Sequence, residues 1–173
     1  MPRPLSERSA TYDEVGATCP AEPEWRARPR GYRSFERTVV VGHGEHLWRS
    51  ASAALLAWEV KTCSGFEVHP AGRVRTGQRL ELLARIGPLR LREPVFIAAV
   101  VDEPDRRGFA YGTLDGHPVA GEEAFVLHRE GDEVWLTLRS LTRPPRGRWR
   151  LAFPAVLVAQ RVYRRRYARA LRP

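Results

Sequence analysis

The pattern of apolar and polar positions in the first third of the chain predicts an arm, a strand and a helix. Residues 1–31 show little periodicity and predict an irregular N-terminal arm. Residues 35–41 alternate as expected for a strand that has one apolar face. Apolar residues recur at helical spacing over 45–60, with Lys61 in the last turn, so a helix follows the first strand.

The rest of the chain predicts several antiparallel strands and a closing helix. After 143–150 the chain becomes helical, with Pro154 in the first turn and apolar or aromatic residues at steps of four up to Leu171. Alternation or continuous apolar character marks the strands, which we place at 66–68, 78–86, 94–101, 108–114, 121–129 and 133–141.

This order predicts an α+β fold, with a curved antiparallel sheet of about seven strands and one helix after the first strand. A curved sheet with an apolar concave face needs a cover, so the long C-terminal helix is expected to pack across it. The order resembles the helix-grip arrangement of START-related, Bet v 1-like domains, which commonly hold a hydrophobic ligand between the sheet and the long helix. We therefore expect residues 32–173 to form a single helix-grip-like domain that follows the arm.

Five stretches occur in order along the chain and carry a closer resemblance: TYDEVGAT, GYRSFERTVVVGHGE, AALLAWEV, GFAYGTLDGHPVAGEEAF and RRRYARAL. Together they resemble the domain-of-unknown-function family 1990, a bacterial and plant group. The match runs from about Thr11 to Leu171, and its most specific part lies at 108–125. This resemblance implies a family but no activity.

Strand pairing separates the two adjacent carboxylates at 122 and 123. A tight turn at Gly131 and Asp132 joins the last two strands, so Glu123 lies on the apolar face. There its charge must be paired, hydrogen-bonded or protonated, or lie at the open end of the sheet where water reaches it. Glu122 points the other way, and we expect it to form a surface ion pair with Arg139.

The preceding strand, 108–114, presents either Phe109 and Tyr111 or Ala110 and Gly112 to the core. The loop that follows it leaves the choice open, and the bulkier pair favours Phe109 and Tyr111 inside. Tyr111 is then either an ordinary core aromatic or part of a site. His117 in the loop is not required by turn chemistry, so it is either a solvated loop residue or a polar group of that site.

The net charge of +9 is concentrated at the C-terminal end, where residues 134–173 hold eleven arginines and no Asp or Glu. Either this is a solvated helix face in an arginine-rich chain, or it binds nucleic acid or an anionic membrane surface. The predicted outer face of the last helix holds Arg161, Arg164, Arg165 and Arg169.

Other classes of function have little support in the sequence. No run is long and apolar enough for a membrane span, and we expect no signal peptide. Two cysteines in no metal-binding spacing predict a reducing, cytoplasmic location. The GHGEH segment is weak evidence for a metal, and no phosphate-binding or dinucleotide-binding motif is present, so we expect no cofactor.

These observations favour a domain that binds a hydrophobic small molecule or lipid-like ligand between the sheet and the last helix. The expected ligand-binding residues are Phe109, Tyr111, Glu123, Phe125, Leu136 and Leu138. Resemblance to polyketide cyclases of the START-like group gives an alternative, a cyclase-like or hydrolase-like enzyme with Glu123 or His117 as acid or base and Tyr111 orienting a substrate oxygen. A third possibility is binding of nucleic acid or an anionic surface by the basic C-terminal helix.

Overall fold

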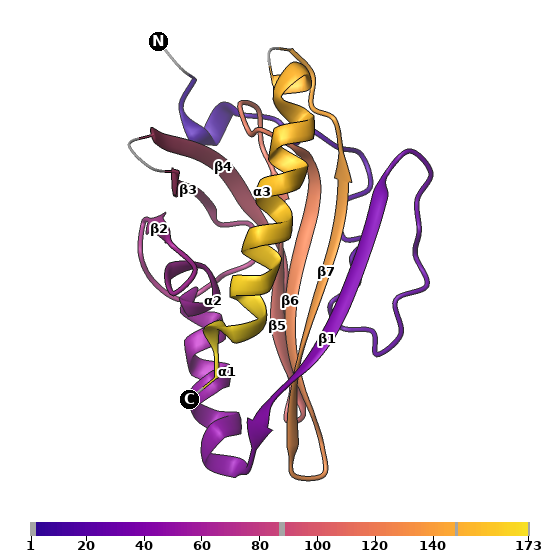
Figure 1. Cartoon of the computed structure of the whole chain (residues 1–173), viewed down its shortest axis with the longest axis vertical. Coiled ribbons are helices and arrows are strands. Elements are labelled where there is room, and N and C mark those ends of the chain that lie inside the picture. Colours follow the sequence, from indigo (N-terminus) through magenta and orange to yellow (C-terminus); the bar gives the residue numbers. More distant parts are fainter. Residues whose placement is uncertain (1–2, 87–88, 148, 173) are drawn as a thin grey trace.

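A curved seven-stranded antiparallel sheet with helices on its inner face forms the body of the protein (Figure 1). The computed structural model describes residues 3–86, 89–147 and 149–172. The strands are β1 (Arg33–His43), β2 (Phe66–His69), β3 (Arg79–Ile86), β4 (Leu89–Asp102), β5 (Arg106–Thr113), β6 (Ala120–Glu130) and β7 (Glu133–Arg143). The helices are a 3-10 turn, η1 (Leu5–Glu7), and the α-helices α1 (Glu45–Leu56), α2 (Glu59–Thr62) and α3 (Trp149–Ala170).

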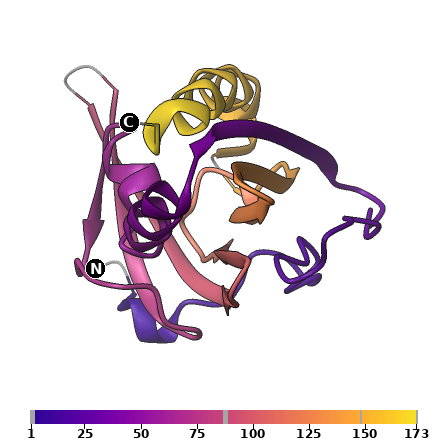
Figure 2. The same cartoon turned by 90° about the horizontal axis from the view of Figure 1, so that it is seen from below.

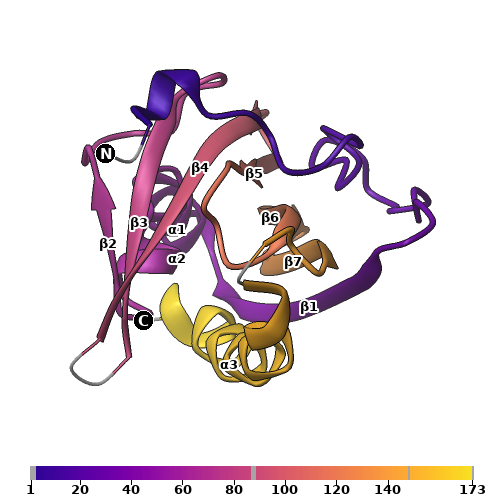
Figure 3. The same cartoon turned by 90° about the horizontal axis from the view of Figure 1, so that it is seen from above.

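The strand order is β1-β7-β6-β5-β4-β3-β2, so the first two strands of the sequence form the two edges of the sheet. Helices α1 and α2 connect these edges, and α3 runs along the same inner face (Figures 2 and 3). The predicted fold class is confirmed. The turn at Gly131 and Asp132 joins β6 and β7 as predicted, and in their register Glu123 lies opposite Ser140 and Glu130 opposite Glu133.

The helix predicted after the first strand is confirmed, but it is not continuous over 45–60, because the chain breaks between α1 and α2. Trp58 adopts a left-handed conformation with φ 71°, which is uncommon for a bulky side chain. This conformation places the indole in the core, 1% exposed, with its ring centroid 4.6 Å from that of Phe109. Tertiary packing therefore overrides the helical pattern, and α2 carries Lys61 inward instead of into solvent.

The inner face of β5 carries the bulky residues, as predicted. Phe109 and Tyr111 are 0% and 4% exposed and belong to the same core cluster as Trp58. The β5–β6 register sets Phe109 opposite Phe125 and Tyr111 opposite Glu123. Strand alternation thus places the rings of β5 and β6 and the Glu123 carboxylate on the face of the sheet that α3 covers.

The N-terminal arm covers the outer face of the sheet, and Glu122 holds it there. The Glu122 carboxylate is 2% exposed and accepts hydrogen bonds from the Tyr12 hydroxyl and the Gly16 amide, both at 2.7 Å, and from the amide and hydroxyl of Thr18. Gly112 leaves room for this arm, since a Cβ there would lie 2.0 Å from the Tyr12 hydroxyl oxygen. The predicted surface ion pair of Glu122 with Arg139 is therefore wrong.

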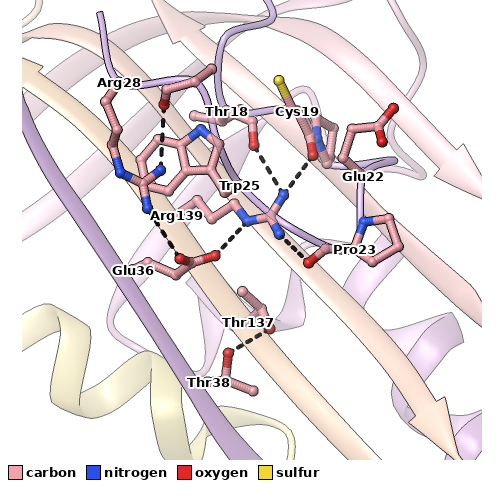
Figure 4. A network of polar contacts seen from close by, with 12 residues as sticks. Thr18, Cys19, Glu22, Pro23, Trp25, Arg28, Glu36, Thr38, Thr137 and Arg139 are labelled. Carbon is pink, nitrogen blue, oxygen red and sulfur yellow. Dashed lines mark hydrogen bonds and ion pairs between the residues drawn. The ribbon is translucent and has the colours of Figure 1, made fainter.

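Arg139 also holds the arm, through partners other than Glu122 (Figure 4). Its guanidinium is 1% exposed and forms an ion pair with Glu36 at 2.9 Å. It donates to the main-chain carbonyls of Thr18, Cys19 and Pro23. Burial of both charges by the arm was not visible in the sequence, because the arm itself has no periodic pattern.

Helix α3 begins at Trp149, so Pro154 lies in its second turn, which corrects the predicted position in the first turn. Tyr163 and Tyr167 face the sheet and form a stacked pair with ring centroids 6.2 Å apart. Arg164 also turns toward the sheet, which corrects its predicted place on the outer face. It donates to the Ser140 hydroxyl at 2.8 Å and lies over the ring of Phe35.

Candidate functional site

A cavity of about 480 Å³ lies between the inner face of the sheet and α3. Aliphatic and aromatic residues of the sheet and of α3 form most of its apolar wall, including Phe66, Ala84, Leu91, Val156, Ala159 and Tyr163. Polar side chains from five different elements and one loop also line it, among them Lys61, Glu93, Tyr111, His117, Glu123 and Gln160. Its size and composition are those of a small-molecule site, which is typically apolar with a few converging polar groups.

The first polar group of the cavity is a cluster centred on Lys61. The Lys61 ammonium lies 2.8 Å from a Glu123 carboxylate oxygen and donates to the Tyr167 hydroxyl at 2.7 Å. The Tyr111 hydroxyl donates to the same Glu123 oxygen. Burial and the Glu123 charge raise the pKa values of Tyr111 and Tyr167 well above their ordinary value. Both tyrosines therefore keep their protons.

The ion pair is almost completely removed from water. The side chain of Lys61 is 2% exposed and that of Glu123 is 15% exposed. The ammonium also lies over four aromatic rings, at 4.4 Å from the Tyr167 centroid and at 4.6 to 5.4 Å from those of Phe66, Tyr111 and Phe125. Desolvation of two charges is unfavourable, and these hydrogen bonds and ring faces offset it.

A second polar group, formed by Glu93 and His117, lines another part of the cavity. A carboxylate oxygen of Glu93 is 3.7 Å from Nε2 of His117, and both side chains are nearly buried. Nδ1 of His117 accepts a hydrogen bond from the Val119 amide, whereas Nε2 has no hydrogen-bond partner among the described residues. Burial raises the pKa of Glu93 to about 7 and lowers that of His117 to about 3. At neutral pH the imidazole is therefore uncharged and Glu93 is partly protonated.

The residues predicted for the site fall into two sets. Tyr111, His117 and Glu123 line the cavity. Phe109 and Phe125 are fully buried core residues beneath it, and Leu136 and Leu138 line a separate space of only about 10 Å³ nearer β1. The three predicted polar residues thus line one cavity, whereas the four predicted apolar residues do not line it.

Three further polar residues of the site escaped the sequence analysis. Lys61 is the only lysine of the chain, but its place in the last turn of the predicted helix gave no sign that it is buried. Glu93 alternates with Leu91 and Val95 on the inner face of β4, so the strand pattern was sufficient to find it. Tyr167 was assigned to packing by its helical spacing, which says nothing about the partner of its hydroxyl.

Two other features bear on the kind of site. Within residues 3–86, 89–147 and 149–172, no three His, Cys, Asp or Glu side chains gather so that they can hold a metal ion. None of the described helices combines the length and the apolar character needed to cross a membrane.

Comparison with known proteins gives a family and a fold. The profile of a family described as Domain of unknown function (DUF1990) matches residues 11–170. A UPF0548 protein of Deinococcus radiodurans is 37% identical over 180 residues, which cover 95% of this chain and 87% of that protein. A UPF0548 protein of Arabidopsis thaliana is 28% identical, and the alignment covers 82% of this chain and 72% of that protein.

Among solved structures, norcoclaurine synthase from Thalictrum flavum, in complex with dopamine and hydroxybenzaldehyde, is similar with a TM-score of 0.51 and 10% identity. The similarity covers 79% of this chain and 84% of that one, and at this identity it concerns the fold alone. Together with the seven-stranded antiparallel sheet, the helical segment after β1 and the C-terminal helix, this similarity gives a Bet v 1-like, helix-grip fold. The profile match and the Deinococcus relative together show that the chain belongs to the DUF1990 family.

Proposed function

We propose that this protein binds a hydrophobic small molecule or lipid-like ligand in the cavity between the sheet and α3. The observation that carries the proposal is a space of about 480 Å³, within the range of small-molecule sites, with an apolar wall and converging polar groups. A solid core does not leave a space of this size, because protein interiors are close-packed.

The polar groups indicate the kind of ligand. His117 presents a buried, unpartnered Nε2, and an unsatisfied buried polar atom is unfavourable by about 1–3 kcal/mol. A ligand hydroxyl or carbonyl oxygen that accepts a hydrogen bond from this nitrogen removes that deficit. The ligand we propose is therefore a largely apolar molecule with at least one neutral polar group, held at the end of the cavity where Glu93 and His117 lie.

Native mass spectrometry of freshly purified protein tests this proposal, with the denatured mass as reference. We expect an additional mass that organic solvent extracts, together with a lower occupancy in a His117→Phe variant that lacks the polar partner. A clean apo mass in the wild-type protein, followed by failure to bind any neutral apolar probe, contradicts the proposal.

Acid–base catalysis in the same cavity is a second candidate, and Glu93 is the observation that favours it. A general acid or base works best when its pKa lies near the working pH, and burial raises the pKa of Glu93 to about 7. Glu123 is already occupied by Lys61 and Tyr111, and the low pKa of His117 makes it a weak base. The catalytic group in this alternative is therefore Glu93 rather than Glu123 or His117.

Hydrolysis of a nitrophenyl ester with a short acyl chain tests the enzymatic alternative. It predicts turnover with an inflection near pH 7 that disappears in Glu93→Gln, while the affinity for a non-hydrolysable apolar probe is retained. Equal turnover by the wild-type protein and Glu93→Gln at every pH contradicts it.

A cytoplasmic location is part of the proposal. Cys19 and Cys63 are both free thiols, and free cysteines are typical of reducing compartments. Fractionation of cells that produce the untagged protein tests this location.

A further inference from the structure

A second hollow, outside the cavity, lies between the first half of β1 and α3. This groove has a volume of about 630 Å³. Five arginines line it, two from β1 and three from α3, and no acidic residue does: Arg33, Arg37, Arg161, Arg164 and Arg165. We call it the arginine groove.

The arginine groove differs from the rest of the surface in how its charge is arranged. Some exposed arginines elsewhere pair with carboxylates, as Arg49 does with Glu45, whereas others, such as Arg30 and Arg75, have no ionic partner among the described residues. Among the described residues, none forms an ion pair with the four exposed arginines of the groove, Arg33, Arg37, Arg161 and Arg165. What sets the groove apart is therefore that guanidinium groups from two elements gather around one hollow that no acidic residue lines.

Arg164 anchors the base of the groove. Its guanidinium lies 3.8 Å from the ring centroid of Phe35 and donates to the Ser140 hydroxyl, while its Nε has no hydrogen-bond partner. The planar group is thus fixed before any ligand arrives. Fixed guanidinium groups bind phosphate oxygens with little loss of conformational freedom.

We propose that the arginine groove binds a multiply charged, phosphate-bearing anion. Guanidinium groups from β1 and α3 line the same hollow. A ligand with two phosphate groups has enough oxygens and charge to bind more than two of these guanidinium groups. A single carboxylate would leave most of these donors unpaired. This site is distinct from the cavity, so the proposal does not depend on the hydrophobic ligand, although Thr142 and Gln160 line both spaces.

Calorimetric titration with inorganic pyrophosphate at low salt tests the groove directly. The variant is Arg161→Gln/Arg165→Gln, which changes two exposed side chains. The matched control is Arg30→Gln/Arg75→Gln, which removes the same charge from two exposed arginines outside the groove. We expect the groove variant to weaken binding at least about tenfold and the control to change it less than about twofold.

A parallel sedimentation assay separates the two sources of such a phosphate. It uses vesicles of phosphatidylcholine with and without phosphatidic acid. Binding of pyrophosphate that the groove variant alone loses supports a free phosphate ligand. Binding only to vesicles that contain phosphatidic acid, again lost only in the groove variant, supports a lipid head group. Absence of both, or equal loss in the control variant, overturns the proposal, whatever the outcome for the cavity.

Discussion

Replacement of Lys61 by methionine tests the polar cluster of the cavity most sharply. Methionine retains much of the apolar stem of lysine but removes the ammonium, so the Glu123 carboxylate loses its ionic partner on an apolar face. Among the described residues, the Tyr111 hydroxyl is then the one remaining side-chain hydrogen-bond donor to Glu123. Removal of one partner from a buried ion pair typically lowers the free energy of unfolding by about 3–5 kcal/mol.

The 15% exposure of the Glu123 side chain lets some water reach the stranded charge. We therefore expect the lower end of that range, about 3 kcal/mol. For a chain of this length, 1 kcal/mol corresponds to a change in Tm of roughly 2–4 °C, so the expected decrease is about 6–12 °C. The double variant Lys61→Met/Glu123→Gln removes both charges, and its free energy of unfolding should be higher than that of Lys61→Met.

Urea denaturation of the wild-type protein, the two single variants and the double variant gives the coupling energy. Arg49→Met serves as control, because it removes a cation from an exposed pair with Glu45, and such pairs contribute at most about 1 kcal/mol. A loss below about 1 kcal/mol in Lys61→Met, or strictly additive losses in the double variant, would refute the argument that the pair is desolvated and coupled.

Three other predictions follow from single contacts. Burial raises the pKa of Glu93 to about 7, so the folded state binds the Glu93 proton more tightly than the unfolded state does. The contribution of Glu93 to the free energy of unfolding is therefore complete below about pH 4.5 and is lost as the pH rises through 7. Urea denaturation should show that Glu93→Gln gains up to about 3 kcal/mol over wild type between about pH 5 and about pH 8, and a pH-independent difference contradicts this. Glu122→Gln should release the arm and speed its limited proteolysis at least about tenfold, whereas the exposed Glu24→Gln should not. Gly112→Ala should destabilise by about 1–3 kcal/mol through collision with Tyr12, and unchanged unfolding contradicts that contact.

The sequence predicted those parts of the fold that depend on local periodicity. Strand alternation on both sides of Gly131 and Asp132 sets the β6–β7 register, and this register alone places Glu123 on the inner face. The bulk of Phe109 and Tyr111 correctly favoured their inward orientation. In each case the information lies within one strand or one hairpin.

Features that depend on contacts between distant segments were missed. Lys61 enters the core because Trp58 turns the chain against β5, 50 residues further along the sequence. Glu122 is buried because the aperiodic arm folds back over it, which no pattern in either segment indicates. The polar cluster of the cavity is assembled from several elements, so only the three-dimensional structure brings its members together.

The most direct test of the central claim is a fluorescence titration with N-phenylnaphthylamine, an uncharged apolar probe. Two neighbouring residues of α3 provide a matched pair of variants, because Ala159 lines the cavity and Val158 is 60% exposed to solvent. We predict saturable binding to the wild-type protein and to Val158→Trp, and strongly reduced binding to Ala159→Trp, whose indole ring fills part of the cavity. Absence of saturable binding to the wild-type protein, or equal binding to both variants, would contradict a ligand site between the sheet and α3.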